Sequence, residues 1–364
     1  MESQDSSKEK YAEKKAAEAC FEAILCLDLA WAESVLLLKY KRKRRPPHPP
    51  LAMLLALIYA RLNHIPSFNQ LYTVLDKDPN LVRELGFRKA PHHDSFSEFA
   101  LRIGAETITE LFQMFVERLK DEIPDLGKGL VAVDTTLFRA YSRPSRPGKR
   151  KTDPDAAWGV AGEKAGKPVY VYGFKLGLVS DEREIPLSFN LFGGKKSRGK
   201  VVRREIDRKK ESIDKQPGLP HDSTLLHQQL LTYLAAGTTP EILTADAGYD
   251  SRENNLLCIK YAIDPVIARK ATKAGQRTRK WDYLLRIQPY SDEWNYYYSK
   301  RSPAVEHVFS RLKQELGLMS LKRRTLPRVT FHVAISLIIM LAIALAAYKN
   351  GRYGDFRSVG PWRH

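Results

Sequence analysis

The chain has 364 residues and 43% hydrophobic content, which suffices for one large globular domain or two ordinary ones and favours a folded chain over a disordered one. A formal net charge of +18 predicts a polyanionic partner, with nucleic acid first and an anionic membrane surface second. The three cysteines form no CxxC pair, so neither a disulfide framework nor a thiolate zinc site is predicted. The polar N-terminal stretch lacks the apolar core of a secretory signal, and we expect a cytoplasmic, nucleoid-associated protein.

Residues 1–127 have the pattern of a helical N-terminal domain, for which we expect DNA binding and dimerisation. Apolar residues recur at helical spacing over 10–29, and a second helix, Leu51 to Leu62, follows the punctuation PPHPP. The stretch Ser95-Phe-Ser-Glu98 has the form of a capping box, which predicts a helix from there to about Leu119.

Three basic runs stand out, at residues 39–45, 195–210 and 269–280. Each has two interpretations: a solvated loop, or a surface that contacts the DNA backbone. For the first run, KYKRKRR, the second interpretation makes DNA-binding residues of Lys41, Arg42, Lys43, Arg44 and Arg45.

The periodicity changes at Gly129, where the sequence begins to alternate short β-branched runs with helical patterns. Strands are predicted at 129–138, 169–181, 184–192, 242–245 and 265–269, and helices at 221–237, 251–262 and 303–318. Either Asp222 or Ser223 is expected to cap the first of these helices. The order β-β-β-α-β-α-β-α is that of an α/β, RNase H-like fold, a mixed sheet flanked by helices. We expect this domain to span 128–348 and a basic tail to follow at 349–364.

The segment from Val329 to Tyr348 is almost uninterrupted apolar sequence, long enough by count to cross a bilayer. It also contains His332 and Ser336, and no second span exists in the sequence. A helix that is buried on all sides within a large core explains such a run equally well.

Three acidic residues stand where a strand or helix would favour an apolar side chain: Asp134, Asp246 and Glu306. Each has an ordinary explanation. Asp134 could cap the following turn, Asp246 could form an Asx-turn, and Glu306 could be a first-turn acid that the helix dipole favours. Their joint placement on the first strand, the fourth strand and the last helix of one fold unit favours a common site.

Phosphodiester chemistry gives a reason to gather three carboxylates. Cleavage needs the phosphate charge neutralised and an oxygen nucleophile activated, and two Mg²⁺ ions about 3.5–4 Å apart do both. Mg²⁺ prefers hard oxygen ligands and keeps several waters, so a few carboxylates are sufficient. We therefore expect two Mg²⁺ ions per active site, with Mn²⁺ as a substitute.

The sequence resembles the DDE-type insertion-sequence transposases of bacteria and archaea, over about residues 50 to 345. The stretches that carry the resemblance are VAVDTTLFRA, DPDAAWG, VYGFKLG, LVSDEREIPL, ILTADAGYDS and YSKRSPAVEHVFSRLKQELGL. The resemblance implies an RNase H-like catalytic domain after a helical domain, and double-stranded DNA as partner, both the terminal inverted repeats and the target. It further implies at least a homodimer in the active complex, and it makes the segment after Pro327 a core helix with no membrane contact.

Residue by residue, the resemblance implies that Asp134, Asp246 and Glu306 are the catalytic, metal-binding triad. Tyr298, Arg301 and Lys313 then match the Tyr-Arg-Glu-Lys motif, with DNA binding as their role. Arg301 stands one residue further from the glutamate than is usual, and a late helix start at Pro303 could reset this geometry.

Two further residues have expected roles. Lys175 is either an ordinary exposed strand lysine or, because of its place beside the strand of Asp134, a phosphate contact. Asp250 has Glu253 three residues later, the spacing of a capping box, so we expect it to start the helix at 251–262.

The function predicted from the sequence is a transposase that cleaves the ends of its element and transfers the resulting 3′-OH. Three alternatives stay open at this point. A domesticated nuclease would only hydrolyse DNA, a catalytically inactive protein would only bind it, and a membrane-attached basic protein would use neither activity.

Overall fold

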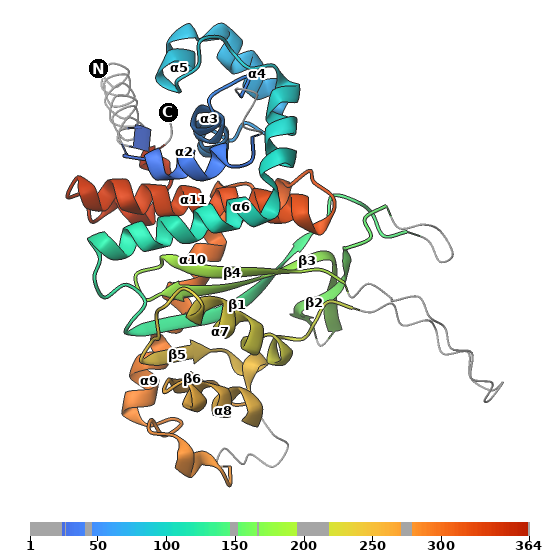
Figure 1. The fold of residues 1–364 in the computed structure, drawn as a ribbon. Helices are drawn as coiled ribbons and strands as arrows, with labels where there is room; N and C mark the ends of the chain where they lie inside the picture. Colours follow the sequence, from blue (N-terminus) through green and yellow to red (C-terminus); the bar gives the residue numbers. More distant parts are fainter. Residues whose placement is uncertain are drawn as a thin grey trace, which may run out of the picture.

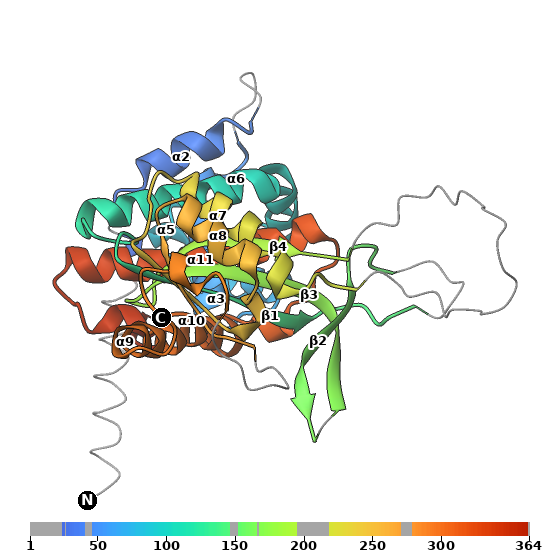
Figure 2. The same cartoon turned by 90° about the horizontal axis from the view of Figure 1, so that it is seen from below.

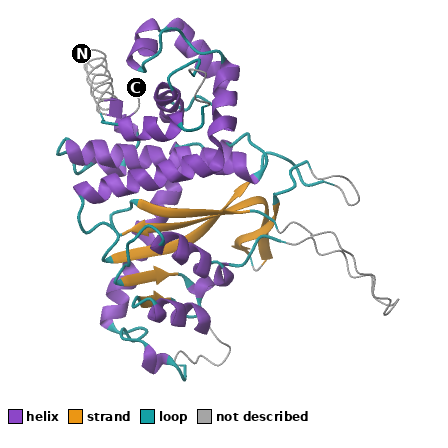
Figure 3. Cartoon of the chain, in the orientation of Figure 1, coloured by secondary structure: helices purple, strands orange, loops and turns teal. Residues whose placement is uncertain are grey.

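The computed structural model describes residues 24–25, 27–40, 46–145, 152–165, 167–194, 218–270 and 279–362. Figure 1 shows three tiers: a cap of short helices, a middle layer of two long helices, and a mixed sheet with its own flanking helices. Coloured by secondary structure, the helical tiers and the strands separate cleanly (Figure 3). The basic runs at 41–45, 195–210 and 271–278 lie outside the described residues, so their predicted DNA contacts stay predictions.

The helical region begins with four short helices and ends with a long one. Pro50 and Pro79 stand in the first turns of two of them, where a missing N–H costs nothing, and Ser67 and Asp78 cap two starts by accepting backbone N–H bonds. The helices are α2 (Ala30–Leu37), α3 (Pro50–Leu62), α4 (Phe68–Lys77), α5 (Pro79–Glu84) and α6 (His93–Glu122). The helix predicted at 51–62 is confirmed as α3, whereas 10–23 lies outside the described residues.

The predicted capping box at Ser95 is wrong. Helix α6 already begins at His93, and the amide of Ser95 donates to the carbonyl of His92, so Ser95 stands within the first turn. The helix also contains a kink at Gly104, where φ is 70°. Only glycine adopts this conformation without strain, so the sequence permits the kink at this position.

The sheet has the strand arrangement of an RNase H-like fold. Strand β3 lies antiparallel to β1, while β5 pairs with β1 and β6 with β5 in parallel, which gives the order β2-β3-β1-β5-β6 with β4 also on β3. The strands are β1 (Leu130–Arg139), β2 (Ala157–Lys164), β3 (Lys167–Asp181), β4 (Pro186–Phe192), β5 (Ile242–Ala245) and β6 (Asp264–Ile267). The predicted fold class is correct.

Strand β2 was not predicted from the sequence. It pairs with the first half of β3, and the two strands form a hairpin that extends beyond the sheet (Figure 2). Its sequence, AWGVAGEK, contains two glycines and lacks a regular apolar alternation because much of the hairpin is exposed. Apolar alternation arises from one buried face, so it does not predict a strand that is exposed.

Four helices accompany the sheet: α7 (Leu226–Leu234), α8 (Arg252–Lys260), α9 (Asp292–Ser299) and α10 (Arg301–Ser310). The last was predicted to begin at Pro303, but it begins at Arg301, and Pro303 stands in its first turn. It continues into a π-helical turn, Arg311–Glu315, before Gly317 turns the chain at φ 71°. Helix α9 was missed because its tyrosines and tryptophan have no regular helical stripe.

Helix α11 (Leu326–Lys349) is long and apolar enough to span a membrane, but 89% of its apolar window is buried inside the structure. It packs along α6 and against α3 and β4, so both the helical region and the sheet bury side chains on it. After it, residues 355–362 form two short turns, and Trp362 is completely buried. Burial of this kind is typical of a core helix.

The core role of α11 leads to a stability prediction. Leu341 is fully buried, so Leu341→Ala should lower the free energy of unfolding by about 2–5 kcal/mol, from lost burial and the cavity left behind. Leu38 is 81% exposed, and Leu38→Ala should change it by less than about 0.5 kcal/mol. Urea unfolding followed by circular dichroism measures both, and equal effects would contradict the core assignment.

Candidate active site

Asp134 and Asp246 lie at adjacent positions of two neighbouring parallel strands. In the register of β1 and β5, Val133 stands opposite Ala245, and each aspartate is the next residue along its strand. Neighbouring strands are about 4.8 Å apart, so the two carboxylates emerge side by side at one sheet edge. The buried strand residues that precede them fix this placement.

Glu306 is brought to the same place by helix α10. The guanidinium of Arg301 donates to Asp134 Oδ2 at 3.0 Å and to Glu306 Oε1 at 3.1 Å, so a single side chain connects the two acids. The glutamate side chain is 52% exposed, while that of Asp134 is 17% exposed. Because α10 begins early, Arg301 stands in its first turn. From there its guanidinium reaches Glu306, although the two residues are one position further apart than is usual.

The electrostatics of the site favour a bound cation. Burial and the charge of Asp246 raise the pKa of Asp134 from 3.8 to about 7, although the Thr135 amide and Arg301 act in the opposite direction. One guanidinium therefore does not compensate the acids gathered here. A group of carboxylates with excess negative charge and no nitrogen or sulfur donor suits a hard divalent ion.

Asp246 is held by a tight turn. Its Oδ1 accepts the amide N–H of Gly248 at 2.8 Å, which is the Asx-type bond that the sequence suggested as an alternative role. A Cβ at position 248 would lie 2.8 Å from Asp246 Oδ1 and 3.3 Å from Asp222 Oδ2. The glycine is required because two carboxylates close over its backbone.

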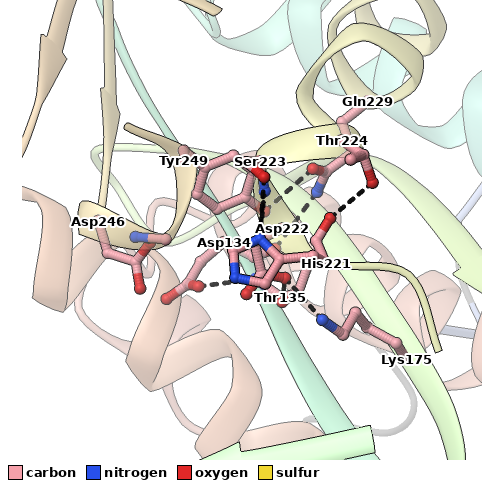
Figure 4. Close-up of polar contacts among 11 residues, drawn as sticks. Asp134, Thr135, Lys175, His221, Asp222, Ser223, Thr224, Gln229, Asp246 and Tyr249 are labelled. Carbon is pink, nitrogen blue, oxygen red and sulfur yellow. Dashed lines mark hydrogen bonds and ion pairs between the residues drawn. The ribbon is translucent and has the colours of Figure 1, made fainter. Parts of the chain in front are cut away.

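Asp222 is a fourth carboxylate of this site, and sequence reasoning missed its role. It was expected to cap a helix, but it lies in a short turn (Asp222–Thr224) before α7, and the His221 side chain caps that turn. Its Oδ1 accepts from Thr135 Oγ1 at 2.5 Å and from Lys175 Nζ at 2.8 Å (Figure 4). Its position beside a predicted helix start concealed it, because caps and site acids share the same residue types.

Lys175 is buried beside the strand of Asp134. Its side chain is 8% exposed and pairs with Asp222, so it is not an exposed strand lysine, whereas its phosphate contact stays a prediction. Strand β3 directs it inward beside β1, where Leu137 is its register partner. The pair Lys175–Asp222 holds Thr135, the residue after Asp134.

A buried tyrosine, Tyr249, is part of the scaffold behind the carboxylates. Tyr249 is completely buried, and its hydroxyl donates to Gln229 Oε1 at 3.0 Å, while Gln229 Nε2 reaches the Asp134 carbonyl at 3.4 Å (Figure 4). Burial, with the charges of Asp134 and Asp222, raises the pKa of Tyr249 well above its usual value. The hydroxyl therefore stays protonated and serves as a donor within the scaffold.

Tyr298 and Lys313 both lie near the acids. The Tyr298 ring stacks on Trp294 at 4.6 Å, and Arg301 lies over it at 5.7 Å, so the tyrosine supports the bridging arginine. Burial lowers the pKa of Lys313, while Asp134 acts to raise it, which places the ammonium within electrostatic range of the site. The π-helical turn changes the direction of the side chains after Ser310, including Lys313.

Asp250 does not cap α8, contrary to the prediction. Ser251 is the N-cap and accepts from Asn254 N at 3.1 Å. The buried Asp250 carboxylate instead accepts from the Lys270 amide at 2.8 Å and pairs with Arg279. It thus fixes both ends of the basic loop that begins after β6.

Among the described residues, one group places three metal-ligand atoms within 4.8 Å of one another: His92, His93 and Asp94 at the start of α6. These are consecutive, largely exposed residues, and the histidines pair with the aspartate. Within the described residues, the ligand atoms of Asp134, Asp246 and Glu306 do not approach one another this closely, and Arg301 binds both Asp134 and Glu306. Donor chemistry and burial favour the sheet edge as the metal site.

The raised pKa of Asp134 predicts a pH-dependent stability. Because its folded pKa of about 7 exceeds the unfolded value of 3.8, ionisation costs stability as pH rises between those values. At about pH 8 in EDTA, Asp134→Asn should be more stable than wild type by on the order of a few kcal/mol, and the difference should shrink toward about pH 5. Urea unfolding at both pH values measures this, and a variant that is less stable at both would contradict it.

Comparisons with known proteins identify transposase domains in this chain. Two family models match the chain, "Transposase domain (DUF772)" over residues 13–102 and "Transposase DDE domain" over residues 211–342, a range that includes Asp246, Glu306 and Lys313. No curated protein matches the chain significantly. Among solved structures, a piggyBac transposase synaptic complex with hairpin DNA is 11% identical, with a TM-score of 0.42 over 94% of this chain and 79% of that chain. A Mos1 transposase paired-end complex is 13% identical, with a TM-score of 0.19 over 70% and 78%.

The two matched ranges follow the order of the structure. The first falls on the helical region, and the second covers α7, β5, α8, β6, α10 and most of α11. The chain therefore contains two transposase domains, which is consistent with a DDE-type insertion-sequence transposase.

Proposed function

We propose that the protein acts as a DNA transposase, in line with its two transposase domains. It binds the ends of its own mobile element and hydrolyses the end phosphodiester, so that water attacks phosphorus and a 3′-OH leaves. That hydroxyl then attacks a phosphodiester of target DNA. The observation that carries the proposal is the placement of Asp134 and Asp246 at adjacent positions of β1 and β5, with Arg301 connecting Asp134 to Glu306.

DDE transposases use divalent metal ions. In this chain Asp134, Asp246 and Glu306 would hold them, as two Mg²⁺ ions with Mn²⁺ as a substitute. The ions supply charge neutralisation at the phosphate and activation of the attacking oxygen. The fit rests on the carboxylate donor set and on the uncompensated charge that raises the pKa of Asp134.

The other site residues position these acids and the DNA. Arg301 fixes the direction of Glu306 and offsets part of the negative charge. Lys313 would hold a DNA phosphate close to the acids, and Tyr298 supports Arg301 from behind. Asp222 and Lys175 are assigned a positioning role through Thr135, because Asp222 accepts hydrogen bonds from both Thr135 and Lys175.

The whole chain has a consistent division of tasks under this proposal. Residues 1–127 would bind element ends and contribute to a homodimer, 128–348 would carry the catalysis, and the basic segment at 349–364 would follow. The basic run at 41–45 and the net charge of +18 favour a double-stranded DNA partner in the cytoplasm, at the nucleoid.

The first test replaces the triad one residue at a time. Asp134→Asn, Asp246→Asn and Glu306→Gln should each lower end cleavage by more than about a hundredfold, a larger loss than residues that only orient a ligand produce. Binding to the same DNA should stay nearly unchanged. The substrate is a labelled duplex from the DNA that flanks the coding region, with cleavage read on a denaturing gel.

The control and the alternatives follow from the same assay. Glu253→Gln, on the exposed face of α8, should cleave like the wild type. A precut end that is joined to target DNA supports a transposase, whereas cleavage without joining indicates a nuclease. Wild-type cleavage by any triad variant would remove that residue from the site.

The second test concerns metal removal. EDTA should abolish cleavage, and either Mg²⁺ or Mn²⁺ should restore it. In a thermal unfolding assay, Mg²⁺ should raise the Tm of the wild type, because a ligand that binds only the folded state stabilises it. Asp246→Asn should lose most of this increase, and an equal increase in that variant would place the ion elsewhere.

A further inference from the structure

A second cluster of charged residues lies between the helical region and α11, apart from the carboxylate site. His332 on α11 is 9% exposed, and both of its ring nitrogens face arginines. Arg61 Nη2 lies 2.7 Å from Nδ1, and Arg323 Nε lies 2.6 Å from Nε2. The catalytic proposal uses none of these three side chains.

The chain itself does not satisfy all the hydrogen-bond donors around His332. A neutral imidazole has one lone pair to accept a hydrogen bond and one N–H to donate, while a guanidinium only donates. One of the two arginines therefore faces an N–H and lacks an acceptor on that side. An additional acceptor is needed to complete this cluster.

The charge of the cluster leads to the same requirement. Arg61 and Arg323 repel each other, and Arg328 adds a third positive charge near Arg323. In the described part of the chain, no carboxylate forms an ion pair with any of these three arginines. Partly buried cations without a counterion are costly, so an anion at this position would stabilise the fold.

A cavity at the cluster provides room for such an anion. It has a volume of about 250 Å³, and its lining includes the polar side chains of Arg323, Arg328 and His332 and the apolar side chains of Phe68, Leu101 and Phe331. The kink of α6 at Gly104 contributes another part of the lining. Arg328 and Leu101 are exposed, so the cavity opens to solvent.

The polar groups of the cavity indicate which anion fits. Two guanidiniums present several N–H donors in planar, paired geometry, which matches the oxygens of a phosphate better than a single-atom anion. The neighbouring acids Asp153 and Asp155 are already occupied, because they accept the backbone N–H groups of Thr325 and Leu326 at 3.1 and 2.8 Å.

We propose that Arg323 and Arg328, with His332, form a phosphate-binding site in the cavity between α6 and α11. Arg61 on α3 lies outside this cavity, at the other ring nitrogen of His332, and adds positive charge. The phosphate comes either from the DNA backbone or from free phosphate in solution. The DNA source rests on the proposed function, whereas the site itself does not. Since α11 and α6 line it together, its occupation would fasten the helical region to α11.

The test uses the full chain and inorganic phosphate. With ionic strength matched by sodium chloride, phosphate should raise the wild-type Tm, and calorimetry should show at least about tenfold weaker binding to Arg323→Gln, which loses charge-assisted hydrogen bonds. Arg324→Gln is the matched control, because the exposed Arg324 lies over Tyr141 and outside the cavity. Arg328→Gln, on the exposed rim, provides a second variant that leaves the buried contacts intact.

The DNA arm separates the two sources. If the backbone supplies the phosphate, Arg323→Gln should weaken binding of a fluorescent duplex and reduce the slope of log K against log salt by about one. If free phosphate is the ligand, duplex binding stays unchanged while phosphate still stabilises the wild type. The proposal is overturned if phosphate gives no more stabilisation than chloride, or if the Arg323 and Arg324 variants respond alike. Neither result depends on DNA cleavage, so the catalytic proposal is judged separately.

Discussion

The burial of like charges, one within β1 and one directly after β5, is the constraint on which the proposed catalytic site depends. Asp134 is largely enclosed and faces the charge of Asp246, and these two effects raise its pKa to about 7. Placing carboxylates together in this way does not stabilise a fold, because the ionised groups repel one another. Neighbouring residues hold these acids in place. Gly248 donates to Asp246, Arg301 donates to Glu306, and the Lys175–Asp222 pair positions Thr135, which follows Asp134.

Helix α11 provides the mechanical counterpart to this electrostatic constraint. Its apolar side chains are buried against α6, α3 and β4, so the helical region and the sheet share one hydrophobic core. A helix that is apolar on every side can serve two neighbours at once, which an amphipathic helix does not. The same property made its sequence compatible with a membrane span.

Much of this architecture could be predicted from the sequence, and the failures have physical reasons. The buried segments that precede Asp134 and Asp246 stand out because both faces are apolar, and the fold class followed from the order of the elements. Strand β2 lacks that pattern because it is exposed. The errors at Ser95, Asp222 and Asp250 share another cause: small polar residues near helix starts resemble caps, and only the three-dimensional structure shows which carboxylate turns away from the helix.

The two charged clusters of this protein are opposite in sign, and each is incomplete by itself. At the sheet edge the excess is negative, which suits a divalent cation. Between α6 and α11 the excess is positive, and both nitrogens of His332 face donors, which suits a phosphate. A protein that completed either cluster with its own side chains would be more stable but would have no place for a ligand. The missing counter-charges are the physical basis of both proposed sites, and the +18 net charge favours a polyanion as one partner.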